Sequence, residues 1–458
     1  MTAIDASEAP VMVGLGPPPK KPGSMRKAAE GGNPFANIPL AAFEQPVWKQ
    51  PSLFFPVYVV SDPAGIRQVL IDKVADYPKT AMENRFFKAI FGDGLLSREG
   101  EAWRAHRRIM APSFDPRSVA GYAGAMASAS QSFSDGWAAL PDGAEKDVSD
   151  EMTALTLEII SRTMFSGDAA EMTGVTGAAL QDSADAAFNF GILDVLPIIG
   201  PIRLAQKVKL MGQLFAPMDG AIARLIEARR ADPGKRDLLG RLVAALDEET
   251  GAKLTAEEVR DEVLTIFVAG HETTASAMTF IWYVLSQQPE WEAKLHAELA
   301  GVLGGRAPTE ADLPKLSLTR RIVEETMRLY PPAPGISARQ AKKTDEIAGV
   351  RVPKGAVVAV SIWVLHRHRL LWDNPERFDP DRFLPERSLG RQRFAYLPFG
   401  GGPRVCIGQQ LAMAEATLIL ATLAQRFRLR LRPGFKMAIR QRVTIRPRDG
   451  LPMTIERR

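Results

Sequence analysis

The chain has 458 residues, a formal net charge of +5 and 46% hydrophobic residues. It can therefore bury a large core, and its small charge excess is not that of a nucleic-acid-binding protein. Its single cysteine excludes an intramolecular disulfide, and no apolar run is long enough for a signal peptide or a membrane span, so we expect a cytoplasmic protein without a membrane span.

The first 39 residues are expected to form an irregular arm, because prolines at 17–19 and at 22 interrupt regular structure. The segment 57–60, Val-Tyr-Val-Val, is β-branched and aromatic and predicts a strand. Asp62 and Pro63 then predict the start of a helix, since proline fits the first helical position.

A short helix is expected over 101–110. Trp103 and Arg107 are four residues apart in it and therefore share one face. An indole N–H next to a guanidinium can hold a carboxylate from two sides. The alternative is an ordinary pair on the protein surface.

Residues 146–246 are predicted to be mostly helical, with breaks at Gly167, Gly191, Pro197, Gly200-Pro201 and Pro233-Gly234. The break at 191–199 is unusually apolar, whereas most loops are polar and lie on the surface. It indicates a lid, a membrane-touching edge or a partner site. Burial against neighbouring helices is an equal alternative.

A long helix is predicted from the capping box at 255–258 to Gln288, about 50 Å at 1.5 Å per residue. Its centre, Ala-Gly-His-Glu-Thr-Thr at 269–274, is a poor helix sequence, because glycine costs about 1 kcal/mol relative to alanine. Residues of low helix propensity at the centre of a buried helix indicate a functional site. Gly270 would let a flat cofactor approach, while Thr273 and Glu272 would donate a hydrogen bond and relay protons.

Two alternatives remain for this segment. His271 is a candidate metal ligand, although Cys406 is the stronger candidate for that bond. Thr273 can also bond back to a helix carbonyl, with Glu272 paired to a buried cation.

A further helix is predicted over 315–330, where Glu325 and Arg328 are spaced to form an ion pair. Arg382 follows in the loop 375–383. Small strands are expected between 347 and 365, and the alternation of apolar and basic residues from 427 predicts half-buried strands near the C-terminus.

The only cysteine, Cys406, lies in a glycine-rich loop, 399–408, before an apolar-periodic helix. At a helix start, the helix dipole would lower the pKa of the thiol and favour the thiolate that binds metal. The alternative is an inert, buried cysteine. One thiolate cannot build a closed zinc site or hold an iron–sulfur cluster, but it suits haem iron.

The loop pattern F-x-x-G-x-R-x-C-x-G resembles the haem-binding loop of cytochromes P450. The motifs W-x-x-x-R, A-G-x-E-T-T and E-x-x-R precede it in that family's order. The resemblance covers about residue 57 to the C-terminus. It implies a mainly α fold with small β-sheets, in which residues 40–458 form one domain with the haem between the long helix and the cysteine-bearing helix.

The resemblance also implies roles for individual residues. Glu272 and Thr273 would be catalytic, Cys406 would ligate the iron, and Glu325, Arg328 and Arg382 would form a structural network. The expected cofactor-binding residues are Trp103, Arg107, Ala269, Gly270, Arg339, Phe399, Arg404, Cys406 and Gly408.

The implied reaction is a monooxygenation that uses haem b and O2 and hydroxylates a hydrophobic small molecule. We expect a monomer that receives electrons from NAD(P)H through a separate ferredoxin or flavodoxin-type donor and its reductase. Arginines near both haem-binding elements predict a basic docking face for that donor: Arg104, Arg107, Arg108, Arg387, Arg391, Arg393 and Arg404. A peroxide-driven peroxygenase and a non-catalytic haem sensor or carrier are the alternatives, and the substrate is not indicated.

Overall fold

The computed structural model describes residues 33–52, 55–168, 199–232, 234–235, 237–247 and 249–458. Most of the predicted arm and residues 191–198 of the apolar segment lie outside these ranges. At the end of the predicted arm, Phe35 is buried and stacks on Trp363, with ring centroids 4.0 Å apart.

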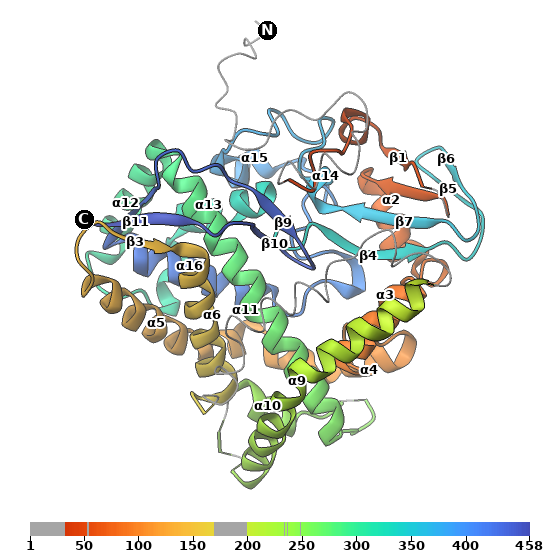
Figure 1. Cartoon of the computed structure of the whole chain (residues 1–458), viewed down its shortest axis with the longest axis horizontal. Helices are drawn as coiled ribbons and strands as arrows, with labels where there is room; N and C mark the ends of the chain where they lie inside the picture. The colour runs from red at the N-terminus through yellow and green to blue at the C-terminus, as the bar shows by residue number, and fades with distance from the viewer. Residues whose placement is uncertain (1–32, 53–54, 169–198, 233, 236, 248) are drawn as a thin grey trace, which may run out of the picture.

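Helix α11 (Ala256–Ser286) runs through the middle of the molecule (Figure 1). Its predicted capping box is confirmed, because Thr255 Oγ1 accepts the Glu258 N–H over 3.2 Å and Glu258 Oε2 accepts the Thr255 N–H over 2.9 Å. The helix is buried on nearly all sides. The helices packed around it include α6 (Val148–Phe165), α9 (Ile199–Ala231), α12 (Pro289–Leu303), α13 (Ser317–Leu329) and α16 (Gln409–Ala424).

The predicted helices at 101–110 and 315–330 are confirmed as α4 (Gly100–Met110) and α13, and Asp62 caps α2 (Pro63–Arg67). The predicted break at Gly200-Pro201 is wrong. Both residues lie in the first turn of α9, where proline is tolerated because its missing N–H would have no helical partner. Further helices are α3 (Ala81–Phe91), α5 (Pro116–Ala138), α10 (Leu238–Ala244), α14 (Ile362–Leu365) and α15 (Pro385–Ser388).

The strands form small sheets, and the largest lies to the right of α11 in Figure 1. Its order is β1 (Val47–Gln50), β2 (Val57–Val60), β7 (Val357–Ser361) and β4 (Gly335–Gln340). The pair β2–β7 is parallel and the others are antiparallel, with an irregularity in β4 between Ile336 and Arg339.

The alternating C-terminal segment forms strands, as predicted. Its sheet has the order β3 (Ala144–Asp147), β11 (Pro452–Arg457) and β8 (Phe427–Leu431). Two-stranded sheets are β9 (Ile439–Gln441) with β10 (Ile445–Pro447) and β5 (Asp345–Ile347) with β6 (Val350–Val352).

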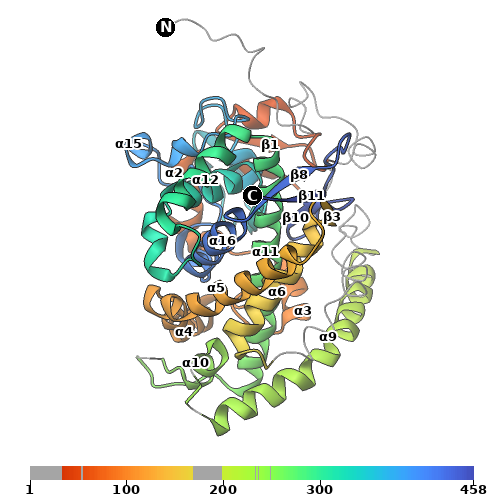
Figure 2. The ribbon, with the colours of Figure 1, turned by 90° about the vertical axis from the view of Figure 1, so that its left-hand side faces the viewer.

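The helical core surrounds α11, and a smaller apolar cluster packs around the four-stranded sheet. Figure 2 shows α9 along one edge of the helical region. In the ranges that the structure describes, no helix has both the length and the apolar character needed to cross a membrane.

Candidate active site

The cysteine loop is shaped by glycine. Gly402 has φ +71°, and a Cβ at this position would lie 2.7 Å from the carbonyl oxygen of Leu70, so a side chain is excluded for two reasons. The Cys406 N–H donates a hydrogen bond to the Phe399 carbonyl over 2.9 Å and closes the loop. Cys406 is not at the helix start itself, because α16 begins three residues later at Gln409.

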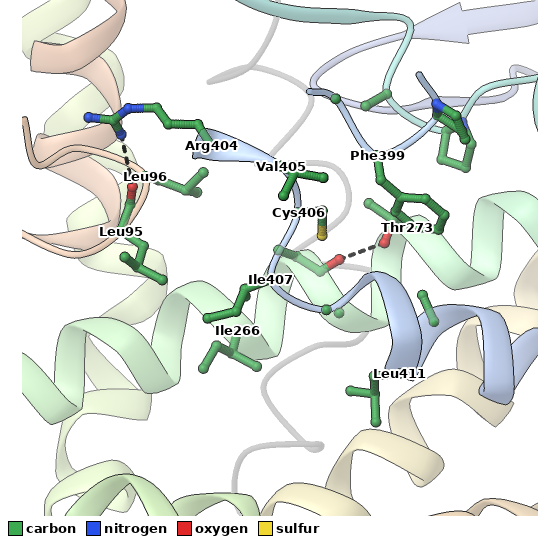
Figure 3. A pocket seen from close by; sticks show the side chains of 18 of the residues that line it. Leu95, Leu96, Ile266, Thr273, Phe399, Arg404, Val405, Cys406, Ile407 and Leu411 are labelled. Carbon is green, nitrogen blue, oxygen red and sulfur yellow. Dashed lines mark hydrogen bonds between the residues drawn. The ribbon is translucent and has the colours of Figure 1, made fainter. Parts of the chain in front are cut away.

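The cysteine opens into a cavity of about 380 Å³. The loop that carries Cys406 lines one side and α11 lines the other, through residues that include Ala269, Gly270 and Thr273 (Figure 3). Phe399 and Gly408 also line it. The structure thus brings the predicted cofactor-binding residues together around one space between α11 and the start of α16.

The protein surroundings raise the pKa of the Cys406 thiol, because burial outweighs the Gly408 N–H and the charge of Arg107, which both favour the thiolate. The sequence predicted a lowered pKa for this thiol. With the protein groups alone, and no bound metal, that prediction is wrong. Cys406 is exposed and lines the cavity, where a bound metal would favour the thiolate.

Cationic side chains line the cavity, and those of Arg339 and Arg404 lie near each other at one end of it. Arg107, Arg339 and Arg404 all line it, together with Trp103. Trp103 and Arg107, which were expected to share one face of α4, both line the cavity. The Trp103 ring also lies against Arg404, with the guanidinium carbon 4.4 Å from the ring centroid. Arg404 also lies 3.2 Å from a Glu99 carboxylate oxygen, and burial lowers its pKa to about 10.

Lys79 belongs to this cationic end, although nothing in its short sequence context indicates it. An isolated backbone bridge joins it to Arg339, and its ammonium donates to the Leu96 carbonyl. Burial, with repulsion from Arg404, lowers the pKa of Lys79 to about 8. Only the fold brings this lysine to the cavity.

The donor set fits a haem. Haem carries two carboxylates, and this cavity has a cationic end where the buried Arg339 Nε has no hydrogen-bond partner among the described residues. The cysteine is a single available thiolate ligand. In the described part of the chain no group of three or more His, Cys, Asp or Glu side chains could hold a metal by itself. His271 does not line the cavity and bonds through Nδ1 to the Phe267 carbonyl over 2.7 Å.

The residues of the α11 centre point in different directions. Thr273 lines the cavity and donates to the Ala269 carbonyl over 2.8 Å (Figure 3). Glu272 does not line it and instead accepts a hydrogen bond from Thr444. Gly270 also permits close helix packing, since a Cβ there would lie 3.1 Å from Ile160 of α6.

Other polar residues of the cavity wall were also missed from the sequence, among them Glu262 and Thr265 on α11 and Glu415 on α16. Burial raises the pKa of Glu415 to about 8, although its hydrogen bond with Thr274 acts against this shift. A carboxylate inside an apolar helical run is a signal that could have identified Glu262 and Glu415.

Glu325 and Arg328 form a fully buried pair, with both side chains 0% exposed and Arg328 Nε 2.7 Å from Glu325 Oε2. Arg382 Nε lies 3.4 Å from the other carboxylate oxygen. Arg328 also donates to the carbonyls of His366 and Pro375 over 2.8 and 2.7 Å. These bonds join α13 to residues 366–375, which precede the cysteine loop in the chain.

The arginines of the expected docking face are largely engaged. Arg104, Arg108 and Arg387 each have a carboxylate partner. Arg391 donates to the Arg382 carbonyl and lies 4.7 Å from the Phe383 ring centroid, so it is a packing residue rather than a free surface cation. Arg393 is exposed.

Comparison with known proteins places this geometry in a family. The sequence profile described as Cytochrome P450 matches residues 29–448. The crystal structure of the cytochrome P450DA heme domain superimposes with a TM-score of 0.82 and 28% identity, covering 97% of both chains. The observed fold is therefore the predicted one, a mainly helical single domain with small sheets.

Two proteins of Streptomyces melanosporofaciens are similar to this chain. Cyclooctatin synthase is 39% identical over 411 residues, which span 87% of this chain and 84% of that protein. Cyclooctat-9-en-7-ol 5-monooxygenase is 33% identical over 449 residues, which span 91% of this chain and 92% of that protein.

Proposed function

The chain belongs to the cytochrome P450 family of haem monooxygenases, and on that premise we propose that it hydroxylates an apolar cyclic terpenoid. The observation that carries the proposal is the cavity between Cys406 and α11, which is lined mainly by apolar side chains apart from its cationic end. The relative that acts on cyclooctat-9-en-7-ol supports an alicyclic, largely hydrocarbon substrate.

The haem, when bound, supplies the iron and the redox chemistry that activates O2. Cys406 would hold the iron through its sulfur. The cationic side chains that line the cavity would hold the propionates through charge-assisted hydrogen bonds: Arg107, Arg339, Arg404 and Lys79, together with the Trp103 indole N–H. Their burial makes these bonds stronger than they would be in water.

Thr273 would deliver protons to the reaction site through its hydroxyl group. Its hydroxyl lines the cavity on the α11 side, and it needs only to rotate away from the Ala269 carbonyl to present a hydrogen bond to the cavity. Glu272 is one residue away, and its contacts with Thr444 and Arg446 support a positioning role or a proton path on that side of α11.

The electron source in this proposal is a separate ferredoxin or flavodoxin-type protein with its NAD(P)H-dependent reductase. Arg393 is an exposed cation near the cysteine loop and supports an acidic donor, because the next residue, Phe394, packs against Gly401 of that loop.

Two measurements test the proposal. Purified holoprotein is titrated with terpenoids, fatty acids, steroids and simple aromatics, and the change in haem absorption reports binding. Bound compounds are then incubated with NAD(P)H and a ferredoxin–reductase pair, or with peroxide alone. The proposal predicts a hydroxylated terpenoid with the redox pair. Product formed with peroxide alone would instead indicate the peroxygenase.

A further inference from the structure

Two buried oxygen atoms on the α11 side of the cavity have no hydrogen-bond partner among the described residues. They are Thr265 Oγ1 and Glu262 Oε2, and both residues line the cavity. They lie one helical turn apart. Buried polar atoms are normally hydrogen-bonded, so two unpartnered ones in one wall indicate a missing partner.

Thr265 differs from the other threonines of α11. Thr273, Thr274 and Thr279 each donate to the carbonyl four residues earlier, over 2.8, 3.1 and 2.7 Å. This bond is the usual solution for a threonine inside a helix. Thr265 does not make this bond, although the residue is only 6% exposed. Its hydroxyl is therefore available to another group.

The Glu262 carboxyl is fixed by its other oxygen. Oε1 accepts the Leu95 N–H over 2.8 Å and lies 3.2 Å from His106 Nδ1. His106 is itself held on the other side, with Nε2 3.1 Å from Glu258 Oε1. The side chain of Glu262 is fully buried, and burial raises its pKa. Its second oxygen is thus positioned but unpaired.

We propose that Thr265 and Glu262 form a polar subsite for a hydroxyl group of the substrate. The inference rests on the proposed function and narrows its substrate class from terpenoid to terpenoid alcohol. A hydroxyl both donates and accepts, so it satisfies the free carboxyl oxygen in either protonation state and the threonine hydroxyl at the same time. A pure hydrocarbon would leave both atoms unpaired.

The spacing along α11 sets where this hydroxyl lies. Thr265 and Glu262 precede Ala269, which lines the cavity from α11, across from the cysteine loop, by four and seven residues. At 1.5 Å per residue the subsite lies about 6–10 Å along the helix from that point. The enzyme would therefore oxidise a carbon several bonds from the existing hydroxyl. A reaction that forms a C–O bond must supply its substrate.

The first test measures binding. Holoprotein is titrated with the tricyclic alcohol cedrol and with cedrane, which lacks the hydroxyl, and the haem absorption change gives each Kd. We expect cedrol to bind about tenfold more tightly or better, since cedrane leaves buried polar atoms unpaired. Thr265→Val should remove most of that preference, whereas the matched control Thr279→Val should keep it. Equal Kd values for both compounds in the wild type overturn the subsite while leaving terpenoid hydroxylation intact.

The second test needs no ligand. Valine matches the shape of threonine, so each substitution removes only the hydroxyl. Thr279→Val loses an existing hydrogen bond and should lower the melting temperature. Thr265→Val loses a hydroxyl without a partner among the described residues and should leave the melting temperature unchanged. An equal drop in both variants shows that Thr265 has a partner within the protein, and the subsite is overturned. If neither cedrol nor cedrane binds, the terpenoid class is contradicted. The melting temperatures of Thr265→Val and Thr279→Val then decide the subsite by themselves.

Discussion

Thr444 donates a hydrogen bond to Glu272 over 2.6 Å and ties the centre of α11 to the turn between β9 and β10. Arg446 Nε lies 3.6 Å from the same carboxylate oxygen. The acid that adjoins Thr273 in sequence thus contacts the β9–β10 turn and does not line the cavity. The proposed roles of the two residues can therefore be separated by substitution.

Thr273→Ala is expected to keep substrate binding and the first reduction but to divert reducing equivalents to hydrogen peroxide, because the cavity loses the hydroxyl that would hold a proton-donating water. The stoichiometry of NAD(P)H consumed, peroxide released and product formed measures this. Thr279→Ala is the control, since it loses an equivalent bond to a helix carbonyl away from the cavity. Wild-type coupling in Thr273→Ala would remove Thr273 from the catalytic residues.

Glu325→Ala should destabilise the protein by about 3–5 kcal/mol, because it leaves Arg328 charged and unpaired in the core. The expected result is a low yield of haem-loaded protein with a lowered melting temperature. Glu227→Ala is a matched control: its pair with Arg230 has the same three-residue spacing, but the two side chains are 68% and 42% exposed. Exposed pairs contribute little, so similar losses in both variants would contradict the structural role of the buried pair.

Arg393→Glu should slow reduction by an acidic donor protein several-fold at low salt, and the difference from wild type should shrink as salt rises. Stopped-flow reduction at several ionic strengths measures this. Arg230→Glu, on α9, is the control for a change of net charge alone. Docking lies elsewhere if the Arg393 variant keeps the wild-type rate and salt dependence.

Much of the fold was predictable because its signals are local. The capping box at Thr255, the proline after Asp62 and the period-two tail each depend on neighbouring residues, and each prediction is confirmed. Lys79 could not be found, because only the pairing of its backbone with Arg339 brings it to the cavity. The packing of Arg391 against Phe383 likewise depends on tertiary contacts that charge patterning does not report.

Glu415 should make stability depend on pH between about 5 and 8. Burial raises its pKa to about 8 in the folded protein, above the ordinary value near 4.3 that applies when the chain is unfolded. The folded state then binds the extra proton, so the contribution is fully present below pH 4 and is lost as pH rises through 8.

Glu415→Gln removes this ionisation. The melting temperature of the variant relative to wild type should therefore rise steadily from pH 5 to pH 8. A difference that stays constant across this range would show that Glu415 ionises normally in the folded protein.

The central claim is that Cys406 is the thiolate ligand of a haem, and the absorption spectrum of the reduced, CO-bound protein tests it most directly. The account predicts the red-shifted Soret band that gives the cytochrome P450 family its name, and its loss in Cys406→His even where haem is retained, because imidazole donates less electron density to the iron than thiolate. Persistence of the shifted band in Cys406→His would contradict the assignment.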